Sequence, residues 1–140
     1  MRAAASPLAP IQRSLYQLLS ADSVLSDLGV GIHDEVDEDT PYPYIRLGES
    51  TQSADNSHDR FGRSITLTLH VWSGQPGPSE ALAIEERVVE LLDHQALDIE
   101  GPSSVKSIRF EFSQQLTDPN PPHPRHTPIR FRITTEQPKE

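Results

Sequence analysis

The apolar residues of the first twenty positions recur at steps of three and four, which predicts an amphipathic helix from about residue 8 to 20. Its apolar stripe consists of Leu8, Ile11, Leu15, Leu18 and Leu19. A short second turn is expected next, capped by Asp22 or Ser23 and ended by Gly29. The side chains expected to face inward from this turn are Val24, Leu25 and Leu28.

Strict alternation of apolar and polar residues predicts strands further along the chain. The clearest case is SITLTLHVW at residues 64–72, which places Ile65, Leu67, Leu69 and Val71 on one face. Two more strands are predicted near the end, where Ile108, Phe110 and Phe112 alternate with Arg109 and Glu111, and Ile129, Phe131 and Ile133 alternate with Arg130 and Arg132. Shorter strands are expected at residues 31–36 and 43–49.

Helical spacing returns between residues 79 and 94, with apolar positions at Ala81, Ile84, Val88, Leu91 and Leu92. The order of helix, strands, helix and strands predicts an α+β fold, a mainly antiparallel sheet with two helices packed on one face. The other face of that sheet would be polar and either solvated or in contact with a neighbouring subunit. It would carry Thr66, Thr68, His70, Arg109, Arg130 and Arg132.

Two polar stretches interrupt this pattern. Residues 49–63 contain almost nothing apolar and indicate a long exposed loop or a hairpin arm. Residues 117–128 are proline-rich, which favours an extended connection over a tight hairpin turn. At 140 residues the chain has the length of one domain, so we expect a single domain over residues 1–140.

Composition narrows the possible functions. The formal net charge of −9 argues against affinity for nucleic acid phosphates or anionic lipids. The chain has no cysteine, which excludes disulfides, thiolate nucleophiles and cysteine-ligated zinc. No segment approaches the roughly 18 apolar residues of a membrane span, and the first ten residues lack the apolar run of a signal peptide. A soluble protein made in the cytoplasm is expected.

The sequence offers little catalytic chemistry. The histidines are scattered, and only His123 and His126 are close, in a proline-rich stretch that favours a surface loop over a metal site. The serines have no nucleophile-elbow context, and the glycines form no phosphate-binding pattern. We therefore expect no catalytic residue, no cofactor and no metal.

An acidic run and a few aromatic residues each leave two interpretations open. The run at residues 34–39 lacks the glycine and terminal glutamate of a calcium loop, so it is either a solvated loop or part of a negatively charged pore wall. The candidate lumen residues are Asp37, Glu38, Asp39 and Glu49. The aromatic residues Tyr42, Tyr44 and Trp72 suit either packing at the edge of the core or anchoring of a partner.

The order of these segments resembles the tail completion family of siphovirus-type phages, also called tail terminator or tail-to-head joining proteins, which has members in gene transfer agents. The resemblance covers nearly the whole chain. It is carried by LYQLLSADSVLSDLG, PYPYIRLGE, ITLTLHVWS, EALAIEERVVELL, IRFEFSQQLTDP and IRFRITTE. Pro121, Pro122 and Pro124 depart from it, since glycine is expected in that loop, and so does His33, where an aromatic residue is expected.

The resemblance implies a structural virion protein and no enzyme. Such a protein forms a ring, usually a homohexamer, that docks on the last ring of the tail tube, stops its growth and faces the head connector, while DNA passes through the lumen without specific binding. It would act at the head-proximal end of the tail after assembly in the host cytoplasm. The candidate contacts to other subunits or to the tube are Asp55, His58, Asp59, Arg60, Phe61 and Arg63.

Two rival functions are weighed beside this one. Another connector component, such as a head-completion stopper, or a tail-tube subunit would also form acidic rings. From a different class, a small cytoplasmic enzyme or ligand-binding domain would require a concave pocket with convergent polar groups.

Overall fold

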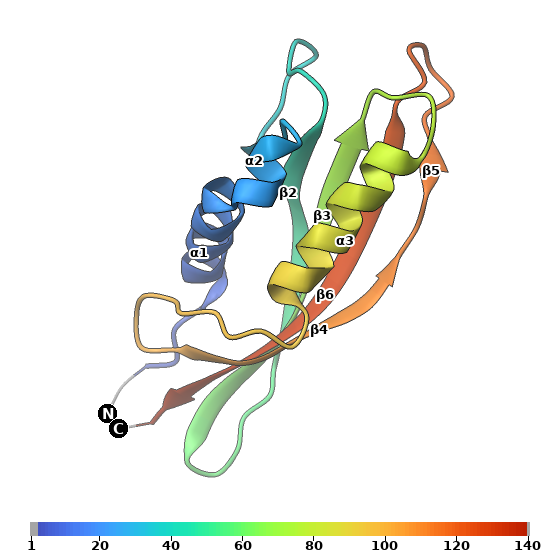
Figure 1. The fold of residues 1–140 in the computed structure, drawn as a ribbon. Helices are drawn as coiled ribbons and strands as arrows, with labels where there is room; N and C mark the ends of the chain where they lie inside the picture. The colour runs from blue at the N-terminus through green and yellow to red at the C-terminus, as the bar shows by residue number, and fades with distance from the viewer. Residues whose placement is uncertain (1–2, 140) are drawn as a thin grey trace.

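A six-stranded sheet forms one layer of the protein and the helices form the other, as the computed structural model of residues 3–139 shows (Figure 1). The strand order is β1-β2-β3-β6-β4, with β5 also paired to β6. Every pairing is antiparallel except that of β1 with β2, so the predicted α+β class and mainly antiparallel sheet are confirmed. The elements are α1 (Leu8–Ala21), α2 (Ser23–Asp27), β1 (Gly31–His33), β2 (Tyr44–Ala54), β3 (Arg60–Ser73), α3 (Ser79–Leu92), β4 (Ser104–Ser113), β5 (Leu116–Thr117) and β6 (Arg125–Pro138).

The core lies between the helices and the two central strands. On the helix-covered face, Leu67 pairs with Phe131, and the apolar pairs on either side of it follow the same register. Phe131 is fully buried, and so are Ile65, Leu69, Ile84 and Ile129. Every second residue of the strands is apolar and packs against the apolar stripes of α1 and α3. Removal of this apolar surface from water is the main contribution to stability.

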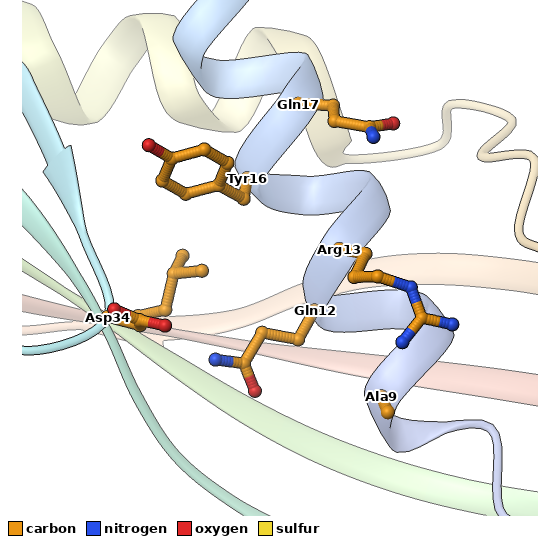
Figure 2. A pocket seen from close by; sticks show the side chains of 7 residues that line it. Ala9, Gln12, Arg13, Tyr16, Gln17 and Asp34 are labelled. Atoms are coloured by element: carbon orange, nitrogen blue, oxygen red, sulfur yellow. The ribbon is translucent and has the colours of Figure 1, made fainter.

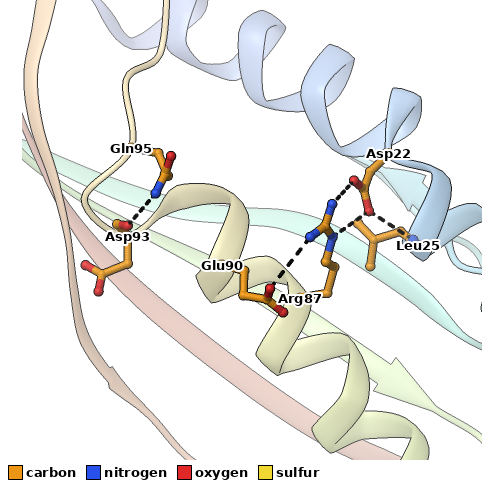
Figure 3. Close-up of polar contacts among 6 residues, drawn as sticks. All are labelled: Asp22, Leu25, Arg87, Glu90, Asp93 and Gln95. Carbon is orange, nitrogen blue, oxygen red and sulfur yellow. Dashed lines mark hydrogen bonds and ion pairs between the residues drawn. The ribbon is translucent and has the colours of Figure 1, made fainter.

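A short helix and an ion pair join the helices to one another (Figure 3). The carboxylate of Asp22 caps α2 by accepting from the backbone N–H of Leu25 at 3.0 Å. It also accepts from Nε and Nη2 of Arg87 on α3, at 3.0 and 2.6 Å. The bonds from Arg87 hold the pKa of the Asp22 carboxyl below its usual value. The predicted turn is therefore a third helix, clamped to α3.

The prediction that Val24 of this turn faces inward is wrong. Leu25 is buried as predicted, but Val24 is 42% exposed. With only five residues, α2 has room for one fully buried position, and the neighbouring side chain on the helix then points outward.

The predicted strand and loop bounds need correction at several points. Of the two structures predicted for the long polar stretch, an exposed loop or a hairpin arm, it forms the hairpin arm, because β2 continues to Ala54 and β3 begins at Arg60. Only residues 55–59 form its loop. The proline-rich connection likewise shrinks to residues 118–124, between β5 and β6. β1 ends at His33 instead of residue 36. The residues after it form a turn in which the N–H of Thr40 donates to the carbonyl of Asp37.

Phe112 lies on the helix-free face of β4, whereas the alternation in the sequence predicts the covered face. The register shifts between Phe110 and Phe112, and Phe112 is paired with Arg130 on the helix-free face. A bulge at Glu111 adds one residue to the strand, so the side chains beyond it exchange faces. Alternation of apolar letters in the sequence cannot reveal such an extra residue.

Candidate assembly surfaces

The hairpin arm, residues 50–63, extends beyond the helices at one end of the sheet (Figure 1). Its β3 half is also paired with the last residues of β6, from Thr134 opposite Ser64 to Pro138 opposite Arg60. Residues 50–59 are all exposed. The arm is therefore a three-stranded extension of the sheet with a polar surface and no helix above it.

The tip of the arm is a defined turn. Asp55 N–H donates to the carbonyl of Gly62 at 2.9 Å, and Ser57 N–H donates to the carbonyl of Arg60 at 3.0 Å. The N–H of Gly62 donates to the side chain of Asn56 at 3.0 Å. A Cβ on Gly62 would lie 2.1 Å from the carbonyl oxygen of Asp55, so only glycine permits this approach of the two strands.

The six predicted contact residues all lie in the arm, but their environments differ. Asp55, His58 and Asp59 are exposed at the tip. Arg60 lies 4.0 Å from the carboxylate of Glu136, and the Lys139 ammonium lies 5.3 Å from the centre of the Phe61 ring. Arg60 and Phe61, like Arg63, are half-buried, so the three exposed tip residues are the most accessible of the set.

The acidic residues predicted to line a lumen fall into two places. Asp37, Glu38 and Asp39 lie in the loop between β1 and β2, at the opposite end of β2 from the arm (Figure 1). Asp37 Oδ1 accepts from the N–H of Asp39 at 3.0 Å, which fixes the turn. Glu49 lies further along β2 and bonds to His70, so the structure does not place it in the acidic loop.

A hydrogen-bonded row crosses the helix-free face of the sheet. Glu49 Oε2 lies 3.0 Å from Nε2 of His70, and Nδ1 of His70 lies 2.7 Å from Nε2 of His126. Gly48 makes room for this row, because a Cβ there would lie 2.5 Å from the His70 ring. Burial, followed by the charges of His70 and Arg46, lowers the pKa of His126 to about 4. His126 is consequently neutral at neutral pH.

Sequence reasoning missed this row. The two histidines are 56 residues apart and meet only because Trp72 on β3 is paired with His126 on β6. The rings of Trp72 and His126 stack with centroids 4.0 Å apart, and Trp72 in turn lies 6.4 Å from Tyr44. Tyr44 is buried, which favours packing over partner anchoring for that residue, whereas Tyr42 is 40% exposed.

Arginines dominate the helix-free face beyond this row. Glu111 bridges two of them, with its carboxylate 3.1 Å from Nε of Arg130 and 2.9 Å from Nε of Arg132. The guanidinium of Arg130 also lies 4.8 Å from the centre of the Phe112 ring. By contrast, α3 on the other layer carries four acidic residues and one arginine. The acidic excess of the chain is therefore not spread evenly over its surface.

An open groove of about 460 Å³ runs along the outer flank of α1 (Figure 2). Tyr16 and Gln12 point to the side of Asp34, whereas Arg13 and Gln17 point away from it. Leu47 of β2 also lines the groove. Its polar groups do not converge on one point, unlike those of a catalytic pocket.

Residues 3–139 contain no group of three or more histidine, aspartate or glutamate side chains arranged to hold a metal ion. None of the helices described is long and apolar enough to cross a membrane.

Comparison with known proteins gives one family. The profile of the family described as "Tail completion protein gp17" matches residues 13–136. The tail completion protein gp17 of Bacillus phage SPP1 is 28% identical over 124 residues, which are 89% of this chain and 90% of that protein. The matched region includes both layers of the fold and the arm.

Two solved structures share the fold. A chain of the virion of a native gene transfer agent particle superposes with a TM-score of 0.83 at 21% identity, covering 95% of this chain and 99% of that one. The structure of bacteriophage SPP1 gp17 gives a TM-score of 0.55 at 23% identity, covering 90% and 88%. Since the family profile spans most of the chain, the protein belongs to the tail completion protein gp17 family, a family of structural virion proteins and not of enzymes.

Proposed function

We propose that this protein is a tail terminator: a homohexameric ring that caps the head-proximal end of the tail tube and joins it to the head–tail connector or stopper protein. The observation that carries the proposal is the family match over residues 13–136. Assembly takes place in the host cytoplasm, and the finished ring is part of the virion tail.

The placement of the polar segments supports a subunit with two different ends. The arm lies at one end of β2, and the acidic loop lies at the other. In the proposed ring, the exposed tip residues Asp55, His58 and Asp59 contact the tube or a neighbouring subunit, assisted by Arg60, Phe61 and Arg63. Growth stops because the face opposite the tube offers no equivalent binding surface for another ring.

The acidic residues have a role in the same proposal. Asp37, Glu38 and Asp39, repeated around a ring, would give a negatively charged wall that repels the DNA phosphates, so that DNA slides through without specific binding. Glu49 takes a smaller part, because its carboxylate is bonded to His70. Burial of an aspartate in a subunit contact instead of a lumen would contradict this assignment.

The test is electron microscopy of particles assembled with and without the protein, scoring tail length and head attachment. Overlong or headless tails in its absence are expected. Normal tails attached to heads would sink the proposal. Purified protein that polymerises alone into tubes would instead favour a tail-tube subunit, and normal tail length with DNA leaking from filled heads would favour a stopper.

A further inference from the structure

One edge of the sheet is open beside α1. β1 pairs only with Tyr44, Ile45 and Arg46, so the rest of β2 has a neighbouring strand on its β3 side alone. Residues 49–54 are exposed and include neither proline nor lysine, the residues that commonly protect a sheet edge. The groove along α1 reaches this strand, because Leu47 of β2 is one of its lining residues.

The opposite edge, β4, is built differently. Its backbone is partly occupied, because the N–H of Phe110 donates to the Asp93 carboxylate at 2.8 Å and the N–H of His94 donates to the carbonyl of Ile108 at 2.9 Å. Its side chains are exposed, with Phe110 at 38% and Phe112 at 43%. Leu82 on α3 and Leu116 on β5 are exposed nearby, so four of the seven large apolar side chains exposed within residues 3–139 lie along this margin.

The charges at the two edges are complementary in the sheet layer. In the sheet layer, β4 exposes Lys106 and Arg109, and the edge of β2 exposes Glu49. In the helix layer, the flank of α3 near β4 exposes Glu86, among other carboxylates, whereas the α1 groove is lined by both Asp34 and Arg13, and Arg13 lies 3.8 Å from Glu100 of its own chain. Two copies placed side by side in the same orientation would bring opposite charges together in the sheet layer.

We propose that the β4 margin of one copy docks on the β2 edge and α1 groove of the next copy. This inference rests on the ring of the proposed function and names its two contact surfaces. β2 and β4 run in opposite directions within the sheet, so the contact would keep the antiparallel alternation from one subunit to the next. Because the two surfaces differ, the contact is heterologous, as a closed ring of more than two copies requires. Phe110, Phe112 and Leu82 would lose their exposure to water in it.

The absence of cysteine from the chain allows a direct test. Ser50→Cys on the β2 edge and Lys106→Cys on β4, combined in one chain, are treated with a short bis-maleimide in assembled particles. Both positions are exposed, so neither substitution disturbs the core. The double variant should give a ladder of covalently linked multimers on denaturing gels, and each single variant should give monomer only.

Charge reversal supplies a second, matched measurement in the cross-linking background. Glu49→Arg or Arg109→Glu alone should reduce the ladder, and the two together should restore it. Dimers from a single-cysteine variant would overturn the inference in favour of an isologous contact. If the double-cysteine variant without charge reversal gave no ladder in particles whose tails are capped and joined normally, the inference would be overturned and the proposed function would stand. The proposed function is tested separately, by the tail length of particles that lack the protein.

Discussion

The two faces of the sheet are made from the same strands but differ in the side chains they carry and in the contacts these make. On the covered face, neighbours such as Leu67 and Phe131 are apolar and buried under the helices. On the helix-free face, polar groups such as His70 and His126 form contacts between strands far apart in the sequence. The covered face supplies most of the stability of the fold, and the free face holds polar contacts that depend on how the strands pair.

The largest expected effect on stability comes from comparing one phenylalanine on each face of the sheet. Phe131→Ala removes a fully buried ring from the centre of β6, and we expect it to lower the free energy of unfolding by about 3–5 kcal/mol. Phe112→Ala removes a ring that is 43% exposed, and the expected loss is below about 1 kcal/mol. Urea denaturation measures both. Similar losses would mean that the free face contributes to the core.

The covered face was largely predictable from the sequence because its signal is local. Alternation over residues 64–72 identified the inward residues of β3, and the helical spacing of Ile84, Val88 and Leu92 identified the buried face of α3. Phe112 was missed because a bulge changes which face a residue occupies without changing the pattern of letters before it.

The candidate surfaces were only partly predictable. Polar composition located the arm, but it did not decide between an exposed loop and a hairpin in which residues 50–54 pair with β3. The Glu49–His70–His126 row and the two unequal sheet edges depend on strand order and register, which link residues by way of the whole fold. No local pattern in the sequence carries that information.

A smaller effect on stability is expected at Asp22, which joins α2 to α3 in the helix layer. Asp22→Ala removes the cap of α2 and its bonds to Arg87, and the expected cost is on the order of 2 kcal/mol. Because the pKa of Asp22 is lowered on folding, this contribution is present above the unfolded pKa and is lost as pH falls through the folded pKa. Asp27→Ala, at an exposed position of α2, is the control for urea melts at pH 7 and pH 3. A wild-type advantage that persists undiminished at pH 3 would contradict the ion-pair account.

The free face should affect stability through pH. The pKa of His126 falls from 6.5 to about 4 on folding, so the unfolded chain binds more protons between these values. Stability should therefore rise with pH through this window and level off above it, with a total change of about 1–2 kcal/mol after allowance for solvent screening. His126→Gln should flatten the rise, and His58→Gln, at the exposed tip of the arm, should leave it unchanged. Identical pH profiles for the wild type and His126→Gln would refute this role.

The smallest effect on stability is expected at the tip of the arm, where the effect on assembly should be large. Replacing Asp55, His58 and Asp59 together by serine removes three exposed side chains but retains Gly62, on which the turn depends. The free energy of unfolding should change by no more than about 0.5 kcal/mol, because no buried contact is lost. Electron microscopy should nevertheless show overlong or headless tails, as in particles without the protein. Asp27→Ser, an exposed change on the helix layer, should leave the tails normal. If the triple variant is as stable as the wild type and still caps tails, the arm tip has no part in binding the tube or a neighbouring subunit, and the sheet edges become the remaining candidates for contacts between subunits.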